Sequence, residues 1–363
     1  MKILHILSTS KWTGPSQFVL DINEYFLENG INSIIALRTK PGGNLIEFIK
    51  EKKLNFYDKL YLYKKFNPFY FFHDLIVLKD FLKNFNPDIV HVHFSLEHIL
   101  AVILKKNFKL IRSVYNTKSA KKRFLSSHLF KKADFIHTVC SEYSELLLKF
   151  NNVDSKKIKI INGWVNENTF SPSGEKDFFK FNDKIKIGMV ARFQKRRAHS
   201  TLVKAFSQLD LSNKILVLTG KGEYMENIKK LVKELNIVDQ VIFTGYIKDK
   251  LPVLLRSLDI FVLLEEGTDG SCRALLEAMA VGLPVIGVNK GGMKEAIIDG
   301  KNGFLISSKN SVNELKEKLK ILCENRELRE EFGKNSRKIV LEKFSKRKNL
   351  EKFLNFYRMV KND

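Results

Sequence analysis

The sequence predicts an α/β protein of two doubly wound, Rossmann-like domains that face each other across a cleft, and three observations support this class. Short apolar runs alternate with helical patterns along the chain. The runs are rich in β-branched and aromatic residues, as expected for strands that a parallel sheet buries on both faces. The length of 363 residues suits two domains of ordinary size.

The first half of the chain contains a clear βαβ unit. A helix is expected between its first two strands, because Phe18, Ile22 and Phe26 recur every four residues and so share one face. Gly30 follows as a C-terminal cap. Strand, helix and strand in this order form a βαβ unit. The strand candidates of this half are Ile3–Leu7, Ser33–Leu37, Ile89–His93, Leu110–Tyr115 and Phe135–Val139.

The second half shows the same alternation of strands and helices after a linker. Residues Ser171–Asp183 contain Pro and Gly and have no apolar periodicity, as is typical of a connection between domains. We therefore expect an N-terminal domain at residues 1–172 and a C-terminal domain at 173–345, followed by a tail at 346–363. Residues Ser311–Asn362 are expected to be helical. The strand candidates are Ile185–Ala191, Ile215–Thr219, Val241–Thr244, Ile260–Leu264, Val285–Val288 and Phe304–Ile306.

Composition and charge narrow the functional classes. The sequence has no run of about 18 uncharged apolar residues, so no transmembrane helix is expected. The short apolar start is interpreted as a strand rather than a signal peptide. Cys140, Cys272 and Cys323 form neither a disulfide framework nor a zinc pattern, which fits a reducing, cytoplasmic location. The net charge of +23 calls for an anionic partner.

Basic residues are concentrated in the segment Lys105–Lys132, which contains no Asp or Glu. Phe108, Phe124 and Phe130 are interleaved with them. This mixture suits the headgroups of an anionic membrane. It could also bind nucleic acid, although no nucleic-acid motif accompanies it. The third interpretation of this segment is an ordinary basic surface in contact with solvent. We expect a membrane surface as the partner and no nucleic acid.

The segment Glu265–Glu295 holds the densest set of candidate functional residues. A strand ends near Leu264, a Gly-containing loop follows, and a helix then begins. This arrangement presents backbone amides to a phosphate, and Gly270 would permit a close approach. Glu277 could hold a ribose through its two acceptor oxygens, while Asp269 could face the same cleft. The alternative for Glu277 is an ordinary helix-surface role.

A second candidate site is the basic loop that follows the strand Ile185–Ala191. Arginine suits bidentate contact with phosphate oxygens, and such cations would stabilise a departing diphosphate. A solvated basic loop is the alternative. Gly14, in a turn with Pro15 after the first strand, is a weaker nucleotide signal or an ordinary turn. The basic loop contains Arg192, Lys195, Arg196 and Arg197.

Histidines cluster at the end of the strand Ile89–His93. His91 and His93 lie on one face of this strand, because side chains alternate along it. The sequence spacing supplies no further ligands for a metal, so no metal site is expected. A satisfied structural role and a role at the acceptor side of the cleft both remain open for these residues.

Together these segments resemble glycosyltransferase family 4, the retaining enzymes with the GT-B fold. The family's E-x7-E signature, commonly EGFGxxLLEAMAxGxPV, is similar to residues 269–285, with Asp269 in place of the first glutamate. Its phosphate motif GRLxxxKG resembles residues 191–198, where Arg197 and Ala198 replace the lysine and glycine. Further matches cover the GG-x-x-E element (Gly291, Gly292, Glu295), the GxG element (Gly220, Gly222) and the linker (Asn162, Gly163, Val165, Asn166, Phe170, Pro172).

The resemblance implies a role for each matching residue. Arg192 and Arg197 would bind the donor diphosphate, Glu277 the ribose, and Asp269 the sugar near its reacting carbon. Tyr115 and Asn116 stand where the family often has a histidine, so the acceptor-side candidates are His93 and Asn116. The helix Asn349–Lys361 would cross back to the first domain. No metal or other cofactor is implied. The remaining donor-binding candidates are Gly14, Gly220, Gly270, Ser271, Cys272 and Arg273.

The activity implied is a retaining, hexosyltransferase-type reaction from a nucleotide-sugar donor to a lipid-linked or polysaccharide acceptor. Cell-envelope products such as lipopolysaccharide, capsule or glycolipid fit, made by a cytoplasmic enzyme peripheral to the inner membrane face. Retention in the family is attributed to front-face attack, in which the leaving phosphate accepts the acceptor's proton. Two rivals are a nucleotide-sugar epimerase of the same shape and a basic surface-binding protein on a decayed transferase fold.

Overall fold

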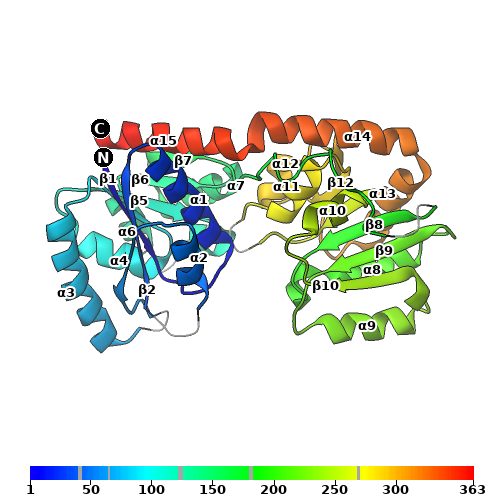
Figure 1. The fold of residues 1–363 in the computed structure, drawn as a ribbon, viewed down its shortest axis with the longest axis horizontal. Helices are drawn as coiled ribbons and strands as arrows, with labels where there is room; N and C mark the ends of the chain where they lie inside the picture. Colours follow the sequence, from blue (N-terminus) through cyan, green and yellow to red (C-terminus); the bar gives the residue numbers. More distant parts are fainter. Residues whose placement is uncertain (40–42, 64–65, 122–125, 180–182, 268–269) are drawn as a thin grey trace. The chain divides into compact units, whose positions relative to one another are not determined.

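The computed structural model describes residues 1–39, 43–63, 66–121, 126–179, 183–267 and 270–363. These residues form two compact units, each built around one parallel β-sheet (Figure 1). The first unit comprises residues 1–162, 268–271 and 348–363, and the second comprises 163–267 and 272–347. The predicted class, two Rossmann-like α/β sheets, is confirmed.

The sheet of the first unit has the strand order β3-β2-β1-β4-β5-β6-β7. The chain runs outward from β1 to β3 and then returns to the other side of β1, so the order reverses between β1 and β4. The strands are β1 (Lys2–Leu7), β2 (Asn32–Arg38), β3 (Phe56–Leu60), β4 (Ile89–Val92), β5 (Lys109–Val114), β6 (Phe135–Thr138) and β7 (Ile158–Ile160).

Helices connect these strands in the right order for a doubly wound sheet. Helix α1 lies between β1 and β2 as expected, and Gly30 follows its end with a φ of +71°, which confirms the predicted cap. The helices are α1 (Gly14–Glu28), α2 (Leu45–Glu51), α3 (Pro68–Phe85), α4 (Ser95–Ile103), α5 (Thr117–Ala120), α6 (Ser126–Lys132) and α7 (Ser141–Asn151).

The sheet of the second unit has the order β10-β9-β8-β11-β12-β13, which reverses between β8 and β11. All the strand candidates of this half are confirmed within about one residue. The strands are β8 (Ile185–Val190), β9 (Lys214–Thr219), β10 (Val241–Gly245), β11 (Ile260–Leu263), β12 (Val285–Val288) and β13 (Gly303–Ile306). The helices are α8 (His199–Ser207), α9 (Met225–Glu234), α10 (Leu251–Arg256), α11 (Arg273–Ala280) and α12 (Gly291–Ala296).

The C-terminal tail is helical, as expected. Helices α13 (Val312–Glu324) and α14 (Arg326–Ile339) belong to the second unit, and a π-helical turn at Val340–Phe344 follows them. Helix α15 (Lys346–Asn362) then packs, from Lys348 onward, with the first unit. Phe353, Phe356 and Tyr357 are the large side chains that it buries there. Among the helices of the described residues, none is both long and apolar enough to cross a bilayer.

The basic segment Lys105–Lys132 differs from the expected membrane surface. Phe108 and Phe130 are buried, and Arg112 lies inside β5, so these side chains pack in the unit rather than face a membrane. Phe108 follows helix α4 and Phe130 lies on α6, where each turns its ring toward the core. The third phenylalanine, Phe124, lies outside the described residues, together with Lys122 and Arg123.

Two lysines of this segment are also neutralised by acids that come later in the chain. The Lys105 Nζ lies 2.7 Å from an Asp134 carboxylate oxygen, and the Lys109 Nζ lies 3.6 Å from Asp363. The sequence count found no acid within the segment, but the folded chain brings these two acids to it. The positive charge available to an anionic surface is therefore smaller than the sequence predicts.

Candidate functional site

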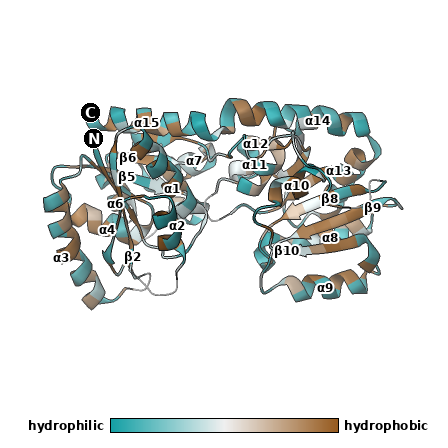
Figure 2. Cartoon of the chain, in the orientation of Figure 1, coloured by the Kyte–Doolittle hydropathy of each residue, from teal (hydrophilic) through white to brown (hydrophobic). Residues whose placement is uncertain are grey.

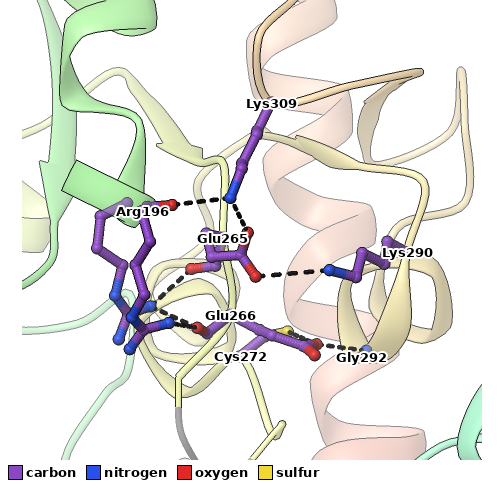
Figure 3. Close-up of polar contacts among 8 residues, drawn as sticks. Arg196, Glu265, Glu266, Cys272, Lys290, Gly292 and Lys309 are labelled. Carbon is purple, nitrogen blue, oxygen red and sulfur yellow. Dashed lines mark hydrogen bonds and ion pairs between the residues drawn. The ribbon is translucent and has the colours of Figure 1, made fainter. Parts of the chain in front are cut away.

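The loops after β8 and β11 meet where the strand order of the second sheet reverses, the usual ligand position in such a sheet. Arg197, in the loop after β8, joins them. Its Nη1 donates to the backbone carbonyl of Glu265 at 2.7 Å and to that of Glu266 at 2.6 Å. Arg196 makes a longer contact, 3.4 Å from its Nη1 to the Glu266 carbonyl (Figure 3). The arginine loop therefore holds the loop that precedes α11.

Lysines from two further loops of the same sheet edge converge on Glu265. The Lys309 Nζ lies 2.6 Å from one carboxylate oxygen of Glu265, and the Lys290 Nζ lies 3.6 Å from the other (Figure 3). Burial alone would raise the pKa of Glu265, but the hydrogen bond from Lys309 and the nearby positive charges outweigh it and lower that pKa. Glu265 is thus a fixed anion among cations.

Glu266 is buried and held by the next loop along the sheet edge. Its Oε2 accepts a hydrogen bond from the Gly292 backbone N–H at 3.2 Å, and the Cys272 Sγ lies 3.9 Å away (Figure 3). Gly291 has a φ of +54°, and a Cβ there would collide with this carboxylate. The glycine pair of the GG-x-x-E element therefore makes room for Glu266. The acid of the same element, Glu295, pairs with Lys343 at 2.9 Å.

The predicted donor-binding residues divide between exposed and structural positions. Arg192 is exposed directly after β8, whereas Arg197 is partly buried by its bonds to the Glu265–Glu266 backbone. On α11, Arg273 begins the helix and Glu277 is half-buried one turn later. Ser271 and Cys272 are buried just before that helix. Asp269 lies outside the described residues.

Backbone geometry explains why glycine is needed at two of the predicted glycine positions. Gly220, after β9, has a φ of +144°, and a Cβ there would collide with the Ala191 carbonyl. Gly270 belongs to the first unit and has a φ of +62°, and its Cβ would lie 2.5 Å from the Tyr115 carbonyl oxygen. Gly14 begins α1. Gly220 and Gly270 are therefore required by close backbone approach, whether or not a ligand is bound.

Two residues that replace glycines of the family pattern take the left-handed conformation that glycine favours. Ala198 has a φ of +58° and Cys272 a φ of +51°, and each precedes the first residue of a helix, α8 or α11. For residues with a Cβ this conformation costs about 1–2 kcal/mol. The fold therefore keeps the backbone of the glycine-containing loops although this chain lacks the two glycines.

Replacing Ala198 with glycine is expected to raise the free energy of unfolding by about 0.5–1 kcal/mol, because the left-handed strain disappears at the cost of some chain entropy. Ala205→Gly, in the middle of α8, is the matched control and should instead lower it by about 1 kcal/mol. Urea unfolding of both variants measures the difference. A loss of stability in Ala198→Gly would contradict the strain argument.

A second polar cluster lies inside the first unit, where its strand order reverses between β1 and β4. His5 on β1 pairs in register with His91 on β4. The rings of His91 and His93 are 4.3 Å apart between centroids, which confirms that they share a face. All three are buried. Burial lowers the pKa of His5 to about 3, and it also lowers the pKa values of His91 and His93, so all three are neutral at pH 7.

Hydrogen bonds connect these histidines into one chain of buried side chains. The His93 Nδ1 lies 2.7 Å from the Tyr115 hydroxyl, and the His93 Nε2 lies 3.1 Å from the His5 Nδ1. Tyr357 of α15 contacts the His5 Nε2 at 3.5 Å and hydrogen-bonds to the His91 Nδ1. From the other ring nitrogen of His91 the chain runs on to Ser113 at 2.7 Å, to His137 at 2.8 Å and to the Ile161 carbonyl at 3.0 Å.

The final carbonyl fixes the position of every proton in this chain. A carbonyl only accepts, so the His137 Nε2 carries the proton, and the Nδ1 of this neutral ring must accept one from Ser113. The same reasoning makes His91, His5 and His93 each carry the proton on Nε2. The hydroxyl protons of Tyr357 and Tyr115 then point to His91 and His93. One directional arrangement satisfies all seven side chains.

This proton order favours the structural role among the readings that the sequence left open. The ligand nitrogens of His5, His91 and His93 lie within 4.8 Å of one another, so the cluster could hold a metal ion by distance alone. Hydrogen bonds already use the ring nitrogens, however, so a metal ion could bind only after these bonds are broken. Among the acceptor-side candidates, His93 is buried behind Tyr115, and the Asn116 side chain caps α5 by accepting the Ser119 N–H at 2.9 Å.

Sequence reasoning missed several residues of both clusters. Lys290, Lys309 and the pair Glu265–Glu266 were not singled out, although two adjacent acids at a strand end are an available signal. Tyr357 was also missed. It lies 266 residues from His91, and no local pattern marks it.

Comparisons with known proteins agree with this architecture. The model of Glycosyltransferase Family 4 matches residues 12–169, and that of Glycosyl transferases group 1 matches residues 173–339. The uncharacterized glycosyltransferase MJ1069 of Methanocaldococcus jannaschii is 30% identical over 281 residues, 76% of this chain and 69% of that protein. The N-acetyl-alpha-D-glucosaminyl L-malate synthase of Bacillus anthracis is 27% identical over 300 residues, 77% of this chain and 76% of the enzyme.

Solved structures show the same fold at lower sequence identity. A glycosyltransferase from Rickettsia africae superposes with a TM-score of 0.82 at 21% identity, covering 99% of this chain and 98% of that one. Anabaena Alr3699/HepE in complex with UDP and glucose gives a TM-score of 0.81 at 15% identity, covering 99% of both. The fold and the cationic sheet edge thus define a glycosyltransferase of the GT-B class. The chain belongs to glycosyltransferase family 4, and it is a retaining enzyme that uses a nucleotide-sugar donor.

Proposed function

We propose that this enzyme transfers a sugar to a lipid-linked or polysaccharide acceptor of the cell envelope. The second unit would bind the donor and the first unit, with α15, the acceptor. Several relatives have such acceptors in their names, among them a diphospho-undecaprenol N-acetylgalactosaminyltransferase of Campylobacter jejuni and a poly(ribitol-phosphate) N-acetylglucosaminyltransferase of Staphylococcus aureus. A peripheral position on the cytoplasmic face of the membrane agrees with acceptors of this kind.

The observation that carries the donor assignment is the excess of cations at the carboxyl edge of the second sheet. Arg192, Lys195, Arg196 and Arg197 follow β8, while Lys290 and Lys309 follow β12 and β13. Glu265 offsets Lys290 and Lys309, and the arginine loop remains strongly positive. A diphosphate is the part of a nucleotide-sugar that matches this charge.

The individual roles come from the family resemblance and, for Arg192, Arg197 and Glu277, also from their positions; Asp269 lies outside the described residues. Arg192 is exposed and lies in the same loop after β8 as Arg197, so we assign it direct contact with the donor diphosphate. Arg197 would position that loop and neutralise part of the charge. Glu277 would hold the ribose, and Asp269 the transferred sugar. Charge developing on the leaving diphosphate would be stabilised by these fixed cations, with no metal required.

Donor binding and turnover by the purified protein test the proposal. A panel of nucleoside diphosphates in a thermal-shift assay should reveal one that stabilises the protein, since bound ligand raises the unfolding temperature according to its affinity. Arg192→Ala and Glu277→Ala should each weaken that nucleotide's binding at least about tenfold, or about 1.4 kcal/mol. Arg326→Ala, an exposed arginine of α14, is the matched control and should bind as the wild type.

Product analysis separates transfer from the rival activity. Incubation of the preferred nucleotide-sugar without an acceptor should leave the sugar's configuration unchanged, whereas an epimerase would convert it. With a lipid-linked acceptor, the product should keep the donor's anomeric configuration. Full activity in both site variants would reject the residue assignment, and transfer to neither acceptor class would reject the acceptor proposal.

A further inference from the structure

Helix α3 presents a strip of apolar side chains to solvent. Phe69, Phe72 and Ile76 are 71%, 61% and 63% exposed, and Phe66, just before the helix, is 72% exposed. The spacing of three and four residues places the helical members on one face. Figure 2 shows brown, hydrophobic stretches along this helix. Contiguous exposed apolar residues of this size mark a surface that contacts something.

The opposite face of α3 fixes the helix in this orientation. Asp74 and Leu78 are buried. The two carboxylate oxygens of Asp74 accept the backbone N–H groups of Tyr61 and Leu62, each at 2.8 Å. Turning the phenylalanines inward would break both bonds and expose Leu78. The strip is therefore a constant feature of the folded unit and not a fluctuation of one side chain.

Lysines continue the strip along α3. Lys79 and Lys83 are exposed and continue the same face of α3. In the sequence Lys64 and Lys65 precede Phe66, but they lie outside the described residues. Between Tyr61 and Lys79 the only acid is Asp74, which is buried. Asp80 is the one exposed acid on the helix. Hydrocarbon flanked by lysines is the pattern of a helix that lies in the interface of an anionic membrane.

We propose that Phe66 and the outer face of α3 form the membrane-binding surface of this enzyme. Phe66, Phe69, Phe72 and Ile76 insert among the headgroups of an anionic bilayer, and Lys79 and Lys83 contact lipid phosphates. This places the contact on α3 instead of the segment Lys105–Lys132, whose described phenylalanines are buried. Membrane binding here requires no donor chemistry, so it can fail or succeed independently of the proposed function.

Vesicle co-sedimentation of the full chain tests this surface. Vesicles of phosphatidylcholine with and without half phosphatidylglycerol should bind the wild type, the anionic ones at least about tenfold more strongly at low salt. Phe69→Ser/Phe72→Ser should lower binding to the anionic vesicles at least tenfold. The matched control, Val238→Ser/Tyr246→Ser, removes two exposed apolar residues from the second unit and should bind as the wild type.

Charge reversal distinguishes α3 from the basic segment. Lys79→Glu/Lys83→Glu should weaken anionic-vesicle binding more than Lys131→Glu/Lys132→Glu, the equivalent change on α6. The proposal is overturned if the wild type binds no vesicle, if the serine variant binds normally, or if only the α6 reversal abolishes binding. It is also overturned if the serine variant merely dissociates a protein dimer, which light scattering without lipid would show. Thermal melts confirm that every variant is folded.

Discussion

Arg197→Ala is expected to lower the free energy of unfolding of the second unit by about 3 kcal/mol and to weaken donor binding at the same time. The Arg197 guanidinium donates to two backbone carbonyls, at 2.7 and 2.6 Å, in the loop before α11. A buried polar group that loses its partner costs about 1–3 kcal/mol, and two carbonyls lose theirs here. The loop before α11 would then no longer be held against the loop after β8.

The neighbouring arginine provides the control for this prediction. Arg196 is exposed, and its guanidinium makes a 3.4 Å contact with the Glu266 carbonyl and a solvent-exposed 3.2 Å contact with the Gln194 side chain, so Arg196→Ala should cost less than about 1 kcal/mol. Arg197→Lys keeps the charge but lacks the planar donor fork, and its stability should fall between those of the wild type and the alanine variant. Chemical unfolding and nucleotide titration measure both effects. Weaker binding without loss of stability in Arg197→Ala would show that Arg197 acts on the ligand alone.

The central strands could be predicted from the sequence because a parallel sheet buries them on both faces. Each central strand therefore appears in the sequence as a continuous apolar run, as in Val285–Val288, which is buried throughout. Strands β3 and β7 were missed for the opposite reason. They lie at the two edges of their sheet, where Phe56–Leu60 and Ile158–Ile160 are largely half-buried or exposed. Edge strands need fewer apolar residues and leave a weaker pattern.

The candidate donor site was predicted only to the level of its loops. The motifs near Arg192 and Glu277 identify the loops after β8 and β11. Such loops can be found in the sequence because their close packing requires glycines and their site requires charged residues at nearby positions. The partners of Glu265 come from other loops, 25 and 44 residues further along, and only strand order brings Lys290 and Lys309 to it. The histidine chain shows the same limit, since Tyr357 enters from the last helix.

Lowering the pH from 7 to 5 is expected to destabilise the first unit strongly, through its buried histidines. Burial lowers the pKa of His5 to about 3 and that of His137 to about 4, whereas both return to about 6.5 in the unfolded chain. Above pH 6.5 neither state binds the protons and stability is complete. Below it the unfolded chain takes them up and the folded chain does not, so stability falls by about 1.4 kcal/mol per pH unit for each histidine.

The expected loss from His5 and His137 alone is on the order of 4 kcal/mol at pH 5, a large part of a typical stability of about 5–15 kcal/mol. His91 and His93 add to it, since burial and then the charges of neighbouring histidines and Arg112 lower their pKa values too. Between pH 6.5 and about 5 the ordinary carboxylates, whose pKa values are about 4, stay mostly ionised. The histidines should therefore dominate the slope.

A single exchange in the hydrogen-bonded chain isolates this effect. In His137→Gln the amide can still donate to the Ile161 carbonyl and accept from Ser113, but it does not titrate. The slope of unfolding free energy against pH should fall by about 1.4 kcal/mol per unit between pH 6.5 and 4. NMR of the imidazole nitrogens at pH 7 provides an independent check, because the directional chain requires the proton on Nε2 in His5, His91, His93 and His137. A mixture of tautomers, or an unchanged slope in His137→Gln, would contradict that arrangement. Only a fully ordered chain of hydrogen bonds keeps these rings neutral and bonded as the solution becomes acidic.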